Sequence, residues 1–251
     1  MGKCLFMRKG ETHTKPYSGP MLGEVAVGSI IQLNESGSLV DYLVVHQGLP
    51  SSAYDESCNG TWLMRKSLSY VSKWHTTSDQ GCSYEQDTTA IKPYMKNLID
   101  IFTPEMQETI KQVTIPYGEY ITSSSTSLHT GADGFSCKLF LLSAPEIGCI
   151  YQAGVADYDR IISDGSKLDY FESGKGTSAL NKRIAYADKT TGDMTSGKAA
   201  PWWLRSTGSY AFRVFEDGTI FSRGSQAYNY GIRTTMILPS SMKLEQLNEI
   251  Q

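Results

Sequence analysis

The segment Pro201-Trp202-Trp203-Leu204-Arg205-Ser206 decides the fold, together with Tyr228-Asn229-Tyr230-Gly231-Ile232-Arg233 further along the chain. Between them, Asp217-Gly218 separates two runs rich in aromatic and β-branched residues within 210–223. An Asp-Gly pair between such runs is a strong hairpin signal. The sequence therefore predicts a β-hairpin held between two apolar anchor segments.

The anchor segments carry large side chains whose places follow from strand geometry. Adjacent residues in a strand point to opposite faces, so we expect one of Trp202 and Trp203 in the core and the other facing loops or solvent. We expect Arg205 and Arg233 to belong to the scaffold, because a guanidinium in a half-buried strand can join loop carbonyls and carboxylates.

The residues around the hairpin mix aromatic, arginine and small polar side chains, a composition typical of binding surfaces. Aromatic residues fall on both faces of the predicted strands, and an excess of exposed aromatic surface marks a binding patch. The alternative is a second small hydrophobic core beneath residues 151–198. The candidate ligand-binding residues are Ser206, Thr207, Ser209, Tyr210, Phe212, Arg213, Phe215, Glu216, Thr219, Phe221, Arg223, Gln226, Tyr228 and Tyr230.

The rest of the chain alternates short strands with loops. Further strands are predicted over 25–33, 40–47, 61–64, 138–143 and 236–238 from their apolar or alternating patterns. The Ser/Thr/Gly-rich stretch 120–134 is predicted as a loop, and the polar stretch 151–198 is predicted as long surface loops that carry short pieces of structure.

Two consecutive helices are predicted over about 89–101 and 104–112. Ile91, Met95 and Leu98 share one helical face, and Thr103-Pro104 is a typical helix start. We expect both helices to pack on a sheet that contains 27–33 and 236–238, or on sheets in contact with each other.

The motifs Trp202-Trp203-Leu204-Arg205-Ser206, Asp217-Gly218 and Gly231-Ile232-Arg233 resemble the C-terminal signature of an uncharacterised domain family common in gut bacteria and their phages and prophages. That family is similar to the formylglycine-generating-enzyme branch of the C-type-lectin fold. The variable proteins of diversity-generating retroelements are relatives on the same fold. The resemblance spans 24–240.

The resemblance implies an α+β domain of C-type-lectin-like fold, with antiparallel sheets, two helices and long loops. It divides the chain into a leader or linker (1–23), the domain (24–240) and a tail (241–251) that is a short helix or disordered. It implies non-catalytic recognition of a protein or glycan on a target cell, by a phage or prophage tail-associated receptor-binding protein or a retroelement-diversified variable protein. The alternatives are an enzyme derived from the formylglycine-generating fold and a structural virion module.

Composition and motif spacing exclude several other classes. The net charge of −3 gives no basic footprint for nucleic acid, and no apolar run reaches the length of a membrane helix. The first nine residues contain too few apolar positions for a signal-peptide core, so we expect synthesis in the cytoplasm. Association with a virion or tail is implied by the resemblance alone.

Catalytic and metal-binding patterns are missing from the sequence. The four histidines do not fall in ligand spacings, and the five cysteines form no CxxC pair. No cysteine follows Cys149, so the late-cysteine chemistry of formylglycine-generating enzymes does not carry over. We expect no catalytic residues and no cofactor. Binding of calcium by a loop stays open, because 157–169 contains the carboxylates Asp157, Asp159, Asp164 and Asp169. The sequence also leaves the oligomeric state open.

Overall fold

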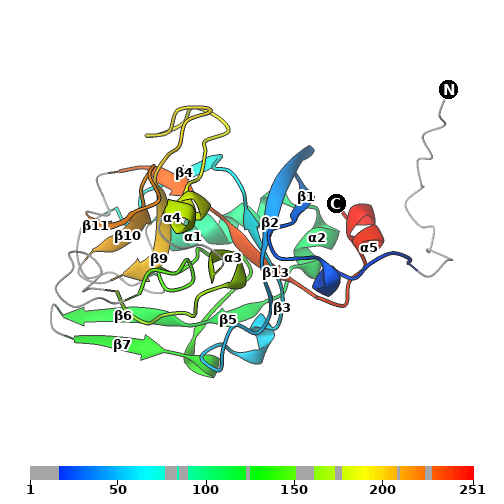
Figure 1. Ribbon diagram of the computed structural model, residues 1–251, viewed down its shortest axis with the longest axis horizontal. Helices are drawn as coiled ribbons and strands as arrows, with labels where there is room; N and C mark the ends of the chain where they lie inside the picture. Colours follow the sequence, from blue (N-terminus) through cyan, green and yellow to red (C-terminus); the bar gives the residue numbers. More distant parts are fainter. Residues whose placement is uncertain are drawn as a thin grey trace.

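The computed structural model describes residues 17–76, 84, 90–122, 125–150, 161–172, 177–207, 210–223 and 228–251. A four-stranded antiparallel sheet has the order β1-β2-β3-β13, built from β1 (Ile30–Glu35), β2 (Ser38–Gly48), β3 (Gly60–Arg65) and β13 (Thr235–Leu238). The first and last strands of the domain therefore share one sheet, as predicted (Figure 1).

The second large sheet contains the predicted hairpin. Its order is β11-β10-β9-β12-β4, from β11 (Ile220–Arg223), β10 (Ala211–Val214), β9 (Trp202–Thr207), β12 (Tyr230–Ile232) and β4 (Tyr70–Ser72). β9 and β12 run parallel, and the other pairs are antiparallel. Val214 pairs with Ile220, and the Asp217 carboxylate accepts hydrogen bonds from the backbone and hydroxyl of Thr219. The hairpin and its Asp-Gly turn are confirmed, as is the α+β class.

Two further strand pairs lie beside these sheets. β5 (Val113–Ile115) pairs with β8 (Phe135–Cys137), and β6 (Tyr117–Thr122) pairs with β7 (Ser125–His129). The prediction of a loop over 120–134 was wrong. The Thr, Tyr and Ile residues of β6 favour strands, and this preference outweighed the Ser- and Gly-rich composition.

The helical region is divided into three pieces: α1 (Ile91–Asn97), the 3-10 helix η3 (Leu98–Ile101) and α2 (Pro104–Thr109). Thr103 caps α2 by accepting a hydrogen bond from the Met106 backbone, as predicted. The second helix ends at Thr109 rather than 112. The predicted apolar face of the two helices is buried in one cluster with side chains of β1, β2, β3 and β13, so the helices cover that sheet as predicted.

The remaining helices are short. They are α3 (Asp169–Glu172), α4 (Thr177–Arg183), α5 (Leu244–Glu249) and the 3-10 helices η1 (Leu22–Glu24), η2 (Glu56–Cys58) and η4 (Gly131–Asp133). None of the helices in the described part of the chain is long and apolar enough to cross a membrane.

The two ends of the described chain meet. The Leu22 backbone donates to the Met242 carbonyl at 2.8 Å, and that of Gly23 donates to the Ser240 carbonyl at 2.9 Å. α5 is held by Leu247, which is fully buried in the same core cluster as Leu22. The end of the predicted leader and the predicted tail therefore lie side by side (Figure 1). Residues 1–16 lie outside the described residues.

The two tryptophans of β9 enter two different core clusters. Trp202 packs with Trp62, Phe140 and Phe212, whereas Trp203 lies in the cluster that includes the helices. The predicted alternation is confirmed. Both side chains are 0% exposed, so of the two options for the second tryptophan, facing loops or facing solvent, solvent was wrong. Both faces of the five-stranded sheet are covered at this point, the Trp203 side by Trp74 and Tyr230.

The predicted strand at 138–143 is buried but is not a strand. Leu139, Leu141 and Leu142 are at most 4% exposed, and Phe140 alone forms a bridge, to Thr235. The apolar composition therefore indicated burial correctly but not strand pairing.

Candidate functional site

Arg213 lies at the centre of a group of four aromatic rings. Its guanidinium carbon is 4.5 Å from the ring centre of Tyr230, 4.7 Å from that of Phe215, 5.5 Å from that of Tyr228 and 5.7 Å from that of Phe221. We call these five residues the hairpin face. A cation against aromatic rings is stabilised by about 0.5–2 kcal/mol, with the larger value where water is excluded.

The pairing of the strands brings these side chains together. Arg213 of β10 is the register partner of Phe221 in β11. Tyr228 and Tyr230 are two residues apart, so their rings lie on the same side, stacked with centres 5.0 Å apart. Trp203 contacts Tyr230 from the core side with ring centres 5.0 Å apart. The core therefore supports the rings from behind.

Exposure varies strongly within the hairpin face. Arg213 is 3% exposed and Tyr230 is 7% exposed, whereas Tyr228 is 38% exposed. Phe215 and Phe221 are half-buried. Burial raises the pKa of the Tyr230 hydroxyl. The face thus presents aromatic rings at its surface, with a positive charge held beneath them.

The other candidate residues are divided between core and surface. Ser206, Thr207 and Phe212 are buried, Tyr210 and Thr219 are half-buried, and Glu216 is exposed. Ser209 and Gln226 lie outside the described residues, as does the side chain of Arg223, although Arg223 itself belongs to β11.

The opposite side of the hairpin is buried as in the alternative prediction, but in the large cluster that contains Trp62 and Trp202 rather than in a second small core. Phe212, Val214 and Ile220 pack in one cluster with Leu168 and Ala185 from the long segment that precedes β9. The short pieces of structure expected in the loops over 151–198 are α3 and α4, but several side chains of 161–172 and 177–198 are buried, so these parts do not lie wholly at the surface. The structure thus brings only one side of the hairpin to the surface.

Arg205 is a buried scaffold residue, as predicted. It donates to both carboxylate oxygens of Glu146, and to the carbonyls of Pro116, Leu141 and Asp164. All five guanidinium N–H groups are thereby used. Arg233 likewise donates to three carbonyls, those of Arg65, Lys66 and Arg183, and it lies over the Trp202 ring. Burial lowers the pKa of Arg233 to about 10.

The contacts that two acids make near Arg205 were not predicted from the sequence, in which Asp164 was considered only as a calcium ligand. Glu146 also accepts from the Tyr54 hydroxyl at 2.6 Å, and Asp164 accepts from the Ser206 hydroxyl at 2.8 Å. Burial is the main cause that raises the pKa of Asp164 to about 7, and the charge of Arg205 opposes this rise. Glu146 is 59 residues from Arg205 along the chain, so no local pattern links them.

The residues considered for calcium do not gather into one site. Asp157 and Asp159 lie outside the described residues. Asp164 binds Ser206, and Asp169 lies 2.9 Å from the Nδ1 atom of His46. Among the described residues there is no group of three or more His, Cys, Asp or Glu side chains able to hold a metal ion.

Comparison with known proteins gives one family. A family model described as a domain of unknown function (DUF6273) matches residues 58–240, which contain both anchor segments and the whole hairpin face. Neither the curated proteins nor the solved structures contain a match to the chain.

Proposed function

The chain belongs to the DUF6273 family, and we propose that it is a non-catalytic recognition protein that binds a protein or glycan on a target cell through the hairpin face. The observation that carries this proposal is the packing of four aromatic rings around Arg213 at the edge of the molecule. Tyrosine and arginine are enriched at the energetic centres of interfaces.

The geometry supports binding because the rings are held in place before a ligand arrives. Tyr228 stacks on Tyr230, which is itself braced by Trp203. Immobilising a flexible side chain costs about 0.5–1.5 kcal/mol on binding. A ring that is already fixed by its neighbours avoids most of this cost, so its contact area contributes more to affinity.

The proposal also includes a C-type-lectin-like fold and a location on a phage or prophage tail. Both are implied by the resemblance of the anchor segments to the uncharacterised family of gut bacteria and their phages. The presence of β1 and β13 in one sheet supports the fold part of the proposal. In the lectin-like arrangement the terminal strands pair with each other, whereas here β2 and β3 lie between them. Diversification by a retroelement would act on the loops around the hairpin face.

The two alternative functions, an enzyme and a structural virion module, require different structural features. An enzyme on the formylglycine-generating fold would require a reactive cysteine pair, and the sequence has no cysteine after Cys149. A structural virion module would bury the hairpin face, including the exposed Tyr228, against another subunit.

The test compares two exposed tyrosines. Tyr228→Ala removes a ring of the hairpin face, whereas Tyr186→Ala removes one that is 57% exposed elsewhere. Binding of the two variants to host cells and to a glycan array would be measured beside the parent protein. We expect loss of binding with Tyr228→Ala alone; equal binding by both variants would contradict the proposal.

A further inference from the structure

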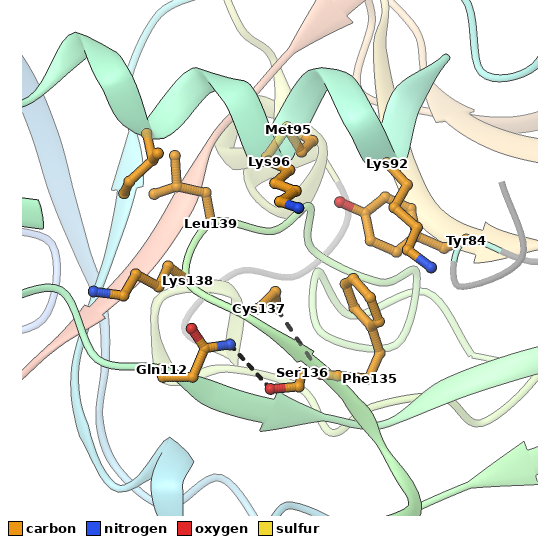
Figure 2. Close-up of a pocket in the computed structure, with 11 residues that line it drawn as sticks. Tyr84, Lys92, Met95, Lys96, Gln112, Phe135, Ser136, Cys137, Lys138 and Leu139 are labelled. Carbon is orange, nitrogen blue, oxygen red and sulfur yellow. Dashed lines mark hydrogen bonds between the residues drawn. The ribbon is translucent and has the colours of Figure 1, made fainter. Parts of the chain in front are cut away.

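Two hollows of the described part of the chain lie away from the hairpin face. Figure 2 shows the first, between α1 and β8, in which Lys92 extends from α1 toward Phe135. The Lys92 ammonium lies 5.3 Å from the centre of that ring, and the Lys138 ammonium donates to the Gln107 carbonyl. Two of the charges beside this hollow therefore serve contacts within the protein.

The second hollow lies where β2 passes the end of β3. Its volume is about 450 Å³, within the range of about 300–1,000 Å³ that is usual for small-molecule sites. It joins three parts of the chain and is lined by Leu39, Val40 and Asp41 of β2, by Lys66 and Ser67 after β3, and by Tyr186 and Asp188 before β9. We call it the β2 hollow.

An ion pair built into the sheet forms one side of the β2 hollow. The Lys66 backbone donates to the Asp41 carbonyl at 3.0 Å, and the Lys66 ammonium lies 3.1 Å from the Asp41 carboxylate. The two side chains are 48% and 33% exposed, so solvent reaches both. An ammonium has three N–H groups. Lys66 can therefore donate to Asp41 and to a ligand at the same time.

Asp188 supplies a second carboxylate, which the protein holds in place. One of its oxygens accepts hydrogen bonds from Arg65 at 3.0 Å, from Ser67 at 2.8 Å and from Ser69 at 2.7 Å. Partial burial raises the pKa of Asp188, but the hydrogen bonds from Ser69 and Ser67 and the charge of Arg65 outweigh it and hold the pKa below its usual value. Asp188 is therefore ionised at neutral pH and fixed in position before a ligand arrives.

The two carboxylates of the β2 hollow are close enough to repel each other. Hydrogen bonds from Gln32 and Lys66 lower the pKa of Asp41, whereas the charge of Asp188 opposes this change. A cationic group placed between the two carboxylates would relieve their repulsion. Lys66, beside Asp41, supplies the opposite charge that an acid group on the same ligand requires.

Apolar surface borders these charges. Leu39 is 66% exposed and Tyr186 is 57% exposed, and both line the β2 hollow. An apolar group in contact with them would remove part of this surface from water, which contributes about 25 cal/mol for each Å² buried. The β2 hollow thus combines two negative charges, one positive charge and an apolar border.

We propose that the β2 hollow binds a free α-amino acid with an apolar side chain. The ligand ammonium would lie between Asp41 and Asp188, and its carboxylate would accept from Lys66. Its side chain would pack on Tyr186 and Leu39. A ligand with one charge would meet a like charge in the same hollow, because an anion faces two carboxylates and a cation faces the lysine. None of the lining residues belongs to the hairpin face, so each proposal can fail without the other.

The experiment compares ligands that share one side chain and differ in charge. L-Phenylalanine carries both charges, N-acetyl-L-phenylalanine only the negative one, and L-phenylalanine amide only the positive one at pH 6, where an α-amino group is protonated. Isothermal titration calorimetry on the full chain measures each affinity. We expect phenylalanine to bind with a Kd below about 5 mM. Each derivative should bind at least about tenfold more weakly, because it lacks one charged hydrogen-bonding group. Glycine, which lacks the side chain, should also bind more weakly by about tenfold or more.

Variants assign the two charges. Asp41→Asn should weaken phenylalanine binding by about fivefold or more and reduce its advantage over N-acetyl-phenylalanine, because the acceptor for the ammonium loses its charge. Lys66→Gln should weaken it by about as much and reduce its advantage over the amide. The matched controls are Asp133→Asn and Lys96→Gln, since both residues are exposed and neither lines the β2 hollow.

Each control should change the affinity for phenylalanine less than about twofold, as expected for a surface change away from the site. Thermal unfolding of every variant verifies that it is folded. The proposal is overturned by equal affinity for phenylalanine and its two derivatives, or by equal losses in the control variants. Full affinity in folded Asp41→Asn, or no saturation by phenylalanine up to about 5 mM, would overturn it as well.

Discussion

Arg205 and Glu146 form a two-pronged ion pair in which neither side chain is exposed to solvent. Nη1 lies 2.5 Å from Oε2, Nη2 lies 2.5 Å from Oε1, and both side chains are 0% exposed. The pair joins β9 to the segment that follows β8, and Tyr54 adds a third part of the chain through its bond to Glu146. One buried pair therefore fixes the sheet of the hairpin against the rest of the core.

Glu146→Gln should destabilise the protein by about 3–5 kcal/mol, because it leaves the buried guanidinium without its opposite charge. The free energy of unfolding would be measured in urea at pH 7. The control is Asp41→Asn, which breaks the partly exposed pair of Asp41 with Lys66 at 3.1 Å. It should cost no more than about 1 kcal/mol, as exposed pairs usually do. A similar loss in both variants would show that burial does not determine the strength of the pair.

Asp164 should make stability depend on pH. Its folded pKa of about 7 lies above the ordinary value of 3.8, so between these values the folded state holds a proton that the unfolded state has lost. Stability from this group is therefore full below about pH 4, falls as pH rises, and is lost above about pH 7.

Asp164→Asn removes the titrating group and keeps an oxygen to accept the Ser206 hydrogen bond. The variant should gain stability relative to the parent as pH rises from 4 to 7. The full gain is up to about 4 kcal/mol, since one pKa unit corresponds to about 1.4 kcal/mol. Urea unfolding at several pH values would measure the difference. A difference that stays constant with pH would show that Asp164 titrates normally.

Gly218 should be irreplaceable in the hairpin turn. Its φ is +83°, and an added Cβ would lie 2.2 Å from the Leu180 carbonyl oxygen of α4. Gly218→Ala should therefore cost about 3 kcal/mol or more, from backbone strain and displacement of the turn. Gly37→Ala is the matched control, because Gly37 has φ +90° and nothing within 4 Å of an added Cβ. It should show the strain alone, about 1–2 kcal/mol. Thermal unfolding of both variants would separate the two effects.

The hairpin could be predicted because its signal is local. The turn pair Asp217-Gly218 and the aromatic and β-branched residues on either side lie within a few residues of one another. The cap at Thr103 was predictable for the same reason. The β6–β7 pair was missed although part of its signal was present, because residues 117–122 contain Tyr, Ile and Thr, which favour strands. The Ser- and Gly-rich flanks concealed it.

Contacts between residues far apart in the chain could not be predicted from sequence patterns. The exposure of Trp203 depends on Trp74, which precedes it by more than a hundred residues and covers that face of the sheet. Spacing along the sequence could not show which acid of the chain is the partner of Arg205, which is Glu146 in the structure.

The two sides of the hairpin should respond differently to truncation. Phe212 is 0% exposed and packs in the core, so Phe212→Ala should cost about 3–5 kcal/mol of stability. Tyr228 is 38% exposed, so Tyr228→Ala should change stability by roughly 0.5–1 kcal/mol, including loss of its stacking on Tyr230. At the centre of a binding surface the same change should weaken target binding by about 2 kcal/mol or more, roughly thirtyfold. Unfolding in urea and binding to host cells would be measured on the same preparations. If Tyr228→Ala lowers stability as much as Phe212→Ala and leaves binding unchanged, the hairpin face is part of the core and the proposed recognition function is wrong.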